Sequence, residues 1–219
     1  FNTMAANLAR HEKDRSEVLA GISHDLRTPL TRLRLEAEMS VADEAARQGI
    51  VADIEQMEAV ISQFMDYARA ESGEQPEVTD LAALLAGIGE RQAAIGRGLE
   101  IDLDGVSTAK IRPRAVGRAV VNLLDNAWKY GGGAISLKAV AVDHEIRIEI
   151  ADRGPGIPQA DMERLKRPFT RLENARTDAS GTGLGLAIVE RIARLHGGRL
   201  ELLANPGGGL LARLVLSLL

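Results

Sequence analysis

The stretch Gly-Thr-Gly-Leu-Gly-Leu-Ala-Ile at residues 181–188 places three glycines directly before or within the start of an apolar, amphipathic segment. Backbone N–H groups in the first turn of a helix have no partner inside the helix and bind phosphate, and glycines let a ligand come close to them. A generic glycine-rich loop is weak evidence, but this order of residues is distinctive. It predicts a phosphate-binding loop at the start of a helix.

Two other motifs precede this loop in the C-terminal part of the chain. Asp-Arg-Gly-Pro-Gly-Ile-Pro at 152–158 directly follows a strongly apolar strand candidate, so that a carboxylate at the strand end can accept the adenine amino proton. Taken alone, this pattern is equally typical of a tight turn. Asn-Leu-Leu-Asp-Asn-Ala-Trp-Lys-Tyr at 122–130 spaces its polar residues three or four apart, mostly along one side of a helix, although a plain surface helix has similar spacing.

Weaker signals lie further along the chain. Pro168 and Phe169 close a helix before a polar stretch at 171–180, which is typical of a mobile lid over a nucleotide, although a lone Phe is more often a core residue. Asn-Pro-Gly-Gly-Gly at 205–209 is a last glycine cluster, or simply a hairpin turn.

Around these motifs the sequence predicts a mixed α/β domain. Before it, residues 1–71 are rich in Ala, Leu, Glu and Arg and predict two long antiparallel helices, with a turn within residues 39–46 and a polar linker at 71–76. The predicted strands and helix starts of the second domain are Glu77–Thr79, a helix from Asp80, Leu99–Leu103, Lys110–Arg112, a helix opened by Pro113, Ala134–Val142, Glu145–Ala151, Gly198–Leu203 and Leu210–Leu218. The expected fold class is therefore α+β.

The first helix carries a histidine in a charged setting. Leu19, Ile22, Leu26, Leu30 and Leu33 recur at helical spacing and form one apolar stripe, which places His24 near the opposite side. A lone histidine in this position is usually a solvated surface residue. A two-helix hairpin cannot bury such a stripe alone, so two copies are expected to form a four-helix bundle.

The neighbours of His24 favour chemistry over the surface alternative. The string Ser-His-Asp-Leu-Arg-Thr-Pro-Leu at 23–30 places Asp25 beside the imidazole, where a carboxylate can orient it for attack on a γ-phosphoryl group. Thr28 lies one helical turn after His24 and can hold a water molecule for the removal of phosphate from a partner. Pro29 removes a helical hydrogen bond and is expected to bend or loosen the helix. A solvated Asp25 and an ordinary kink are the alternatives.

This octapeptide resembles the phosphoacceptor box of sensor histidine kinases, and the C-terminal motifs resemble the Bergerat-type ATP-binding fold that these kinases share with gyrase, Hsp90 and MutL. The stretch 23–32 and the first residues, which resemble the end of a HAMP linker, are most similar to the EnvZ osmosensor subfamily. The resemblance implies a linker at 1–10, a dimerisation and phosphotransfer hairpin at 11–73, and a catalytic ATP-binding α/β sandwich at 74–219.

The resemblance also assigns site residues. Its catalytic residues are His24, Asp25, Arg27 and Thr28. Its residues for ATP are Asn122, Asn126, Lys129, Tyr130, Asp152, Gly154, Gly156, Ile157, Phe169, Arg176, Gly181, Thr182, Gly183, Leu184 and Gly185. Among these, Asn126 is implied to bind Mg²⁺ through its amide oxygen, Asn122 to support the metal and phosphates, Lys129 to place a charge near the phosphates, and Tyr130 to contact the base or ribose.

The implied function is ATP-dependent autophosphorylation on His24, transfer to an aspartate of an OmpR-like response regulator, and dephosphorylation of that regulator by a homodimer. An ATPase of the same fold has a glutamate four residues before the metal-binding asparagine, where this chain has Asn122, and an amide cannot act as a general base. The third alternative is a nucleotide-binding scaffold without transfer, which the intact Asn126, Asp152 and glycines disfavour.

Bulk properties agree with this class. The net charge of −4, the pI near 5.7 and scattered Lys and Arg predict no nucleic-acid binding, and the lack of Cys excludes disulfides and thiolate metal sites. Apolar runs fall well short of the roughly 20 residues of a spanning helix, so we expect no direct membrane contact from these residues. The start at Phe1, without an initiator Met or signal peptide, predicts the cytoplasmic fragment of an inner-membrane protein.

Overall fold

The computed structural model describes residues 21–22, 25–69, 74–172 and 181–218. These divide into two compact units. The first contains the residues up to Arg69 together with Gly181 and Thr182, and the second contains the rest from Glu74 onward.

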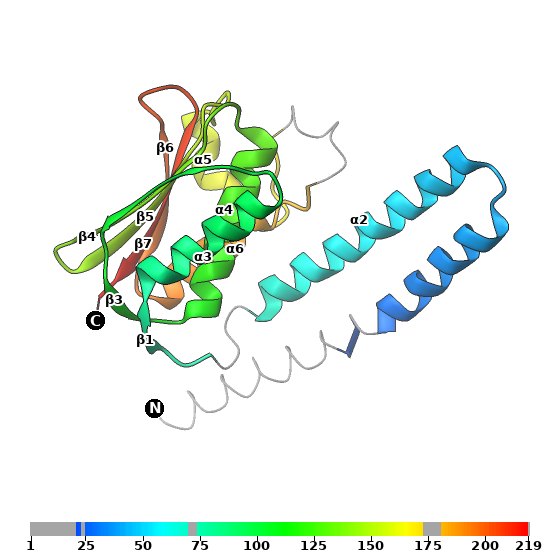
Figure 1. Cartoon of the computed structure of the whole chain (residues 1–219), viewed down its shortest axis with the longest axis horizontal. Coiled ribbons are helices and arrows are strands. Elements are labelled where there is room, and N and C mark those ends of the chain that lie inside the picture. Colours follow the sequence, from blue (N-terminus) through cyan, green and yellow to red (C-terminus); the bar gives the residue numbers. More distant parts are fainter. Residues whose placement is uncertain (1–20, 23–24, 70–73, 173–180, 219) are drawn as a thin grey trace. The chain divides into compact units, whose positions relative to one another are not determined.

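The first unit is a helical hairpin (Figure 1). Residues 25–40 are helical, residues 41–43 form the turn, and α2 spans Glu44–Arg69. The turn falls within the predicted stretch, and Asp43 accepts a hydrogen bond from the backbone N–H of Ala45 (3.0 Å), as an N-terminal cap does. Pro29 does not interrupt the helix, and the Thr31 hydroxyl donates to the carbonyl of Arg27 in the same segment (3.0 Å).

One hairpin buries only part of its apolar stripe. Leu30 and Ile54 are buried, whereas Leu26 and Leu33 keep 45% and 49% of their surface exposed in a single chain. Exposed aliphatic side chains on one face of a helix mark a surface that a partner can cover.

The second unit is built on a five-stranded sheet with the order β2-β4-β5-β7-β6. The strands are β2 (Glu100–Gly105), β4 (Ser136–Val142), β5 (Glu145–Ala151), β6 (Arg199–Ala204) and β7 (Leu210–Ser217). β2 and β4 are parallel, whereas the other neighbours are antiparallel. A separate antiparallel pair joins β1 (Glu77–Asp80) to β3 (Thr108–Ile111). Every predicted strand is present, with no end shifted by more than two residues and Glu145–Ala151 exact.

Helices cover one face of this sheet (Figure 1). They are α3 (Leu81–Ala94), α4 (Pro113–Tyr130) and α6 (Gly185–Leu195), and a short helix, α5 (Gln159–Leu165), follows the Asp152 motif. Alternate β5 residues Ile146, Ile148 and Ile150 are buried beneath them, as period-two alternation predicts. The remaining side chains of the sheet include paired charges, such as Arg213 between Glu149 and Glu201 (2.6 and 2.8 Å).

The start of α4 is capped from a distance. Pro113 occupies the first turn and Arg112 supplies no side-chain cap. Instead the Glu74 carboxylate accepts hydrogen bonds from the backbone N–H groups of Arg114 (2.7 Å) and Ala115 (3.0 Å). A negative charge at this position also stabilises the positive end of the helix dipole, so Glu74, within the predicted linker, helps to fix the helix that carries the asparagines.

Candidate nucleotide site and phosphoacceptor helix

Helix α4 carries the two asparagines at the edge of its buried face. Its apolar residues, such as Val120 and Leu124, are fully buried, whereas Asn122 and Asn126 are half-buried. The Asn122 side-chain amide donates to the carbonyl of Arg118 (2.9 Å). Asn126 Nδ2 is buried and has no hydrogen-bond partner among the described residues. A buried amide without a protein partner is the kind of group that a ligand satisfies.

The glycine loop reaches these asparagines. A Cβ atom added to Gly185 would stand 3.3 Å from Asn122 Oδ1 and 3.4 Å from Asn126 Nδ2. Gly185 is the first residue of α6, and no side chain caps that helix start. The structure therefore brings the first turn of α6, whose backbone N–H groups have no acceptor inside the helix, beside the asparagine edge of α4.

Phe169 is held against the same loop. Its backbone N–H donates to the carbonyl of Gly183 (2.9 Å), and a Cβ at Gly183 would stand 2.8 Å from the carbonyl oxygen of Thr170. The side chain of Phe169 is 65% exposed, so the core alternative is wrong for this residue. Its φ of +60° is unusual for an aromatic residue, and such backbone outliers concentrate at functional sites.

Asp152 directly follows β5 and is almost completely buried, with 7% of its surface exposed. Its Oδ1 accepts hydrogen bonds from the backbone N–H groups of Gly154 (2.9 Å) and Leu210 (3.1 Å). Both bonds fall on one oxygen, and no described residue bonds to Oδ2. The carboxylate is therefore fixed in orientation and keeps one acceptor available.

Glycines join the end of α4 to Asp152. A Cβ at Gly131 would stand 2.5 Å from the Cβ of Asp152, and a Cβ at Gly154 would stand 2.6 Å from the Cα of Gly131. The backbone N–H of Arg153 donates to Gly132 (3.0 Å). Only residues without side chains allow this approach.

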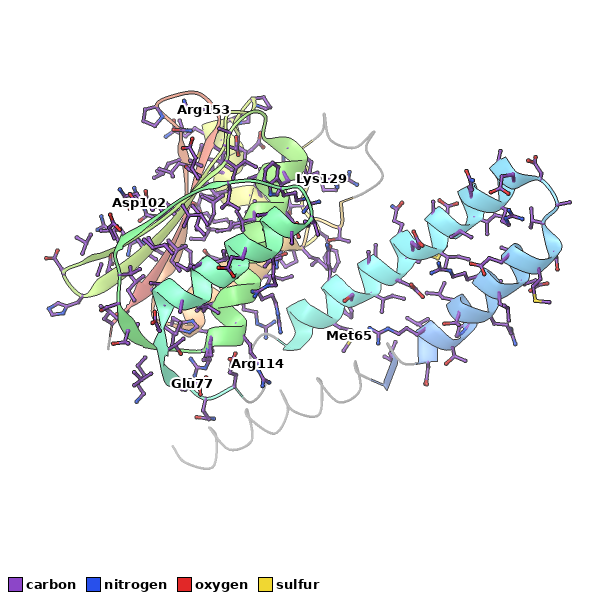
Figure 2. The ribbon with its side chains drawn as sticks, viewed as in Figure 1. Met65, Glu77, Asp102, Arg114, Lys129 and Arg153 are labelled. Carbon is purple, nitrogen blue, oxygen red and sulfur yellow. The ribbon has the colours of Figure 1, made fainter. Side chains whose placement is uncertain are left out.

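The last two residues of α4, Lys129 and Tyr130, are exposed. Lys129 Nζ lies 5.2 Å from the centre of the Tyr130 ring, a cation–π distance. Figure 2 shows Lys129 and Arg114 at opposite ends of α4. Lys129 lies at the end that adjoins Asp152 through Gly131, whereas Arg114 lies at the end that Glu74 caps.

The other predicted nucleotide residues have different environments. Gly156 has a φ of +72° and lies against the carbonyl of Gly209, and Ile157 is half-buried. Leu184 is fully buried, so its side chain belongs to the core and only its backbone can meet a ligand. Gly181 and Thr182 are half-buried and belong to the first compact unit by their contacts. Arg176 lies outside the described residues.

The phosphoacceptor string is only partly described. Asp25, Arg27 and Thr28 are exposed on a helix, and His24 lies outside the described residues. Exposure places these side chains within reach of a partner but does not assign their roles.

The donor set fits Mg²⁺ in one respect. Asn126 Oδ1, on the half-buried amide, is a hard oxygen ligand of the kind that Mg²⁺ prefers, whereas the buried Nδ2 without a partner is a donor that suits a phosphate oxygen. Within the described ranges no group of three or more His, Cys, Asp or Glu is arranged to hold a metal ion. Such an ion would therefore take most of its ligands from phosphates and water, as Mg²⁺ commonly does in nucleotide sites.

Two residues that shape the site have no local sequence signal. Leu210 contributes through its backbone N–H, which carries no signal in the residue type. Glu74 acts from 40 residues before Arg114, and no local spacing connects them.

Comparisons with known proteins identify the family. Residues 111–219 match the model described as "Histidine kinase-, DNA gyrase B-, and HSP90-like ATPase", and residues 14–73 match "His Kinase A (phospho-acceptor) domain". The solution structure of the histidine kinase domain of the E. coli osmosensor EnvZ is 36% identical over 68% of this chain and 92% of that domain, with a TM-score of 0.53. The chain belongs to the histidine kinase family.

Relatives of this histidine kinase are longer proteins. MprB of Mycolicibacterium smegmatis, named a signal transduction histidine-protein kinase/phosphatase, is 34% identical over 95% of this chain and 46% of its own length. The sensor histidine kinase GtrS of Pseudomonas aeruginosa is 35% identical over 96% of this chain and 43% of its own length. The chain thus spans less than half of these relatives.

Solved structures confirm the predicted α+β class and the helical hairpin followed by a mixed sheet with helices. Full-length ShkA in complex with AMPPNP is 25% identical over 92% of this chain and 46% of that protein, with a TM-score of 0.72. No helix in the described part of the chain is both long and apolar enough to cross a membrane.

Proposed function

We propose that this chain binds Mg-ATP in its second unit and transfers the γ-phosphoryl group to its own His24. The observation that carries the proposal is the convergence at one end of α4. There the Asn126 amide, the start of α6, which has no side-chain cap, and the oriented carboxylate of Asp152 offer complementary groups for metal, phosphates and adenine. Family membership supports the same activity.

The proposed nucleotide orientation follows from these three groups. Asp152 Oδ2 accepts a hydrogen bond from the adenine amino group, while Gly154 and Gly156 allow the base to lie close to the backbone. The α6 N-terminus and Lys129 stabilise the phosphates, and Tyr130 contacts the base or ribose. Asn126, supported by Asn122, would hold Mg²⁺, which when bound neutralises phosphate charge.

The remaining predicted contacts belong to the loop region. Phe169, Arg176 and the loop glycines are proposed to close over the nucleotide as its lid. The backbone groups at Gly181, Thr182, Gly183, Leu184 and Gly185 are proposed to face the phosphates.

Transfer requires a nucleophile on the helical hairpin. A neutral nitrogen of the His24 imidazole forms a bond to the γ-phosphorus, and the bond from that phosphorus to the β,γ-bridging oxygen breaks, which releases ADP. Asp25 orients the ring and stabilises the positive charge that develops on it, and Arg27 offers a positive charge beside the transferred group.

Hydrolysis is the competing activity of this fold. The residue in the position of the hydrolytic glutamate is Asn122, whose amide group donates to the Arg118 carbonyl and has no basic function. Phosphate is therefore reserved for His24, and ATP hydrolysis is expected to be slow.

The partners are proposed from chemistry and family. Leu26 and Leu33, exposed in one chain, are covered by a second copy in a four-helix bundle. Phosphorylated His24 transfers its phosphoryl group to an aspartate of a receiver domain of the OmpR type. Thr28 orients the water molecule that later removes the phosphate from that aspartate. The functional boundaries are 1–10, 11–73 and 74–219, within a longer inner-membrane protein whose cytoplasmic part this chain represents.

The fate of γ-labelled ATP tests the reaction class. A histidine kinase yields labelled protein whose phosphoramidate is acid labile and base stable, and this is the expected result. Free labelled phosphate in stoichiometric excess over labelled protein would assign an ATPase. ATP that is bound but unchanged would assign a scaffold.

A further inference from the structure

The turn between β6 and β7 is folded around the side chain of Asn205. The backbone N–H of Asn205 donates to Gly209 (3.1 Å), and that of Gly208 donates to Asn205 (2.8 Å). Asn205 Oδ1 accepts a hydrogen bond from the N–H of Gly207 (3.4 Å). The oxygen of this amide is therefore used within the turn, which leaves its NH₂ group to point elsewhere.

That NH₂ group binds the residue that orients adenine. Asn205 Nδ2 donates to the backbone carbonyl of Asp152 (2.8 Å). On the other side, the N–H of Asp152 donates to the carbonyl of Leu210 (3.0 Å), and the N–H of Leu210 donates to Asp152 Oδ1 (3.1 Å). The backbone carbonyl, backbone N–H and carboxylate of Asp152 are thus all held by residues 205–210.

The turn also packs against Asp152 without space to spare. Gly209 has a φ of +96°, and a Cβ added there would stand 2.2 Å from the Asp152 carbonyl oxygen and 2.6 Å from Oδ1. Arg153 Nη1 donates to the carbonyl of Gly207 (2.6 Å) and joins the turn to the same motif a second time. These contacts fix the turn between β6 and β7 to the end of β5.

We propose that Asn205 is a positioning residue for adenine recognition: its side-chain amide sets the backbone of Asp152, and through it the direction of Oδ2. This inference rests on the proposed function, in which Oδ2 accepts the adenine amino proton. In this role Asn205 acts on Asp152 and not on the nucleotide. It acts because a carboxylate must be aligned to discriminate an amino group from an oxygen at the same ring position, and small misplacements of a buried acceptor reduce that discrimination.

The test compares ATP with inosine triphosphate, which carries an oxygen in place of the adenine amino group. The variants of the whole chain are Asn205→Ala, which removes the hydrogen bond, and Asn205→Asp, which places a second carboxylate against the Asp152 carbonyl. Pro206→Ala is the matched control, because Pro206 is exposed in the same turn and makes none of the bonds to Asp152. Affinities for both nucleotides are measured by calorimetry, and folding by thermal unfolding.

The wild type is expected to prefer ATP. Asn205→Ala is expected to weaken ATP binding about tenfold, the effect of one ordinary hydrogen bond, while its affinity for inosine triphosphate stays nearly constant. Asn205→Asp is expected to lose more, and Pro206→Ala to behave as wild type. A purely structural role would instead lower both affinities together with the unfolding temperature.

The outcomes separate this inference from the function beneath it. If the wild type prefers ATP but the variants keep the wild-type ratio of affinities, or lose both nucleotides equally, the positioning role is overturned and adenine recognition by Asp152 stands. If the wild type itself does not discriminate the two nucleotides, the adenine assignment fails and this inference fails with it.

Discussion

Replacing Asp152 with Asn changes one oxygen to an NH₂ group and little else. The Asn side chain can keep Oδ1 where the backbone N–H groups of Gly154 and Leu210 donate to it, so the local fold is expected to survive. The NH₂ group then stands where Oδ2 stood, and it faces the adenine amino group donor to donor. The strand end is otherwise unchanged.

The expected loss follows from two contributions. A hydrogen bond to a charged acceptor contributes about 1.5 to 3 kcal/mol, and a buried donor without a partner costs about 1 to 3 kcal/mol. Their sum is about 4 kcal/mol, which corresponds to roughly a thousandfold increase in the Kd for ATP. Inosine triphosphate presents an oxygen to the new NH₂ group, so the variant should lose its preference for ATP.

Calorimetric titration of both nucleotides into Asp152→Asn and wild type measures this directly, and a thermal unfolding curve of the variant controls for folding. GTP should compete poorly with ATP for the wild type. An ATP affinity in Asp152→Asn within a few fold of wild type, with the fold intact, would refute the adenine assignment.

Three further perturbations test other parts of the molecule. Thr28→Ala should spare autophosphorylation and slow dephosphorylation of the phosphorylated regulator about tenfold or more, because the water loses its hydrogen-bond partner; rates of both reactions on the same folded dimer decide, and unchanged dephosphorylation would contradict the role of Thr28. Glu74→Gln should lower the free energy of unfolding of the second unit by about 1 to 2 kcal/mol, because an NH₂ group replaces one of the two oxygens that cap α4, and chemical denaturation of variant and wild type measures this. Burial lowers the pKa of His196 below its ordinary value of 6.5. The hydrogen bond to the Ile192 carbonyl and the charge of Glu74 oppose this lowering, and Arg112 adds to it, while Nε2 accepts the N–H of Arg112 (3.1 Å). Below pH 6.5 the unfolded chain therefore binds a proton that the folded chain does not, so the contribution of His196 to stability is complete above pH 6.5 and is lost as the pH falls towards its lowered pKa. His196→Asn should flatten this part of the curve of unfolding free energy against pH, measured by urea unfolding. An unchanged slope in the variant would contradict this role of His196.

Most of the second unit could be predicted because its strands alternate or run apolar between clear turn residues. Ile146, Ile148 and Ile150 illustrate this, since their period of two fixes both the strand and its buried face. Pro113 likewise marked the start of α4. The local sequence pattern was sufficient to predict a strand or helix wherever burial of one face determines its structure.

The site was less predictable wherever it depends on the backbone or on distant residues. Asp152 and Asn126 could be chosen from their motifs, but the fixing of Asp152 Oδ1 by the Leu210 N–H depends on strand pairing rather than residue type. Phe169 on its own predicts a core residue, yet the turn at φ +60° exposes it. The cap from Glu74 joins residues about 40 positions apart, which helix signals read within a few residues cannot detect.

The proposed kinase activity is tested most directly by identifying the residue that carries the phosphoryl group. His24→Gln and the control His144→Gln, at an exposed turn residue, are incubated with γ-labelled ATP, and nucleotide affinity is measured on both. His24→Gln is expected to bind ATP as wild type does but to acquire no acid-labile, base-stable label, whereas His144→Gln is expected to be labelled normally. Persistent labelling of His24→Gln would show that His24 is not the acceptor.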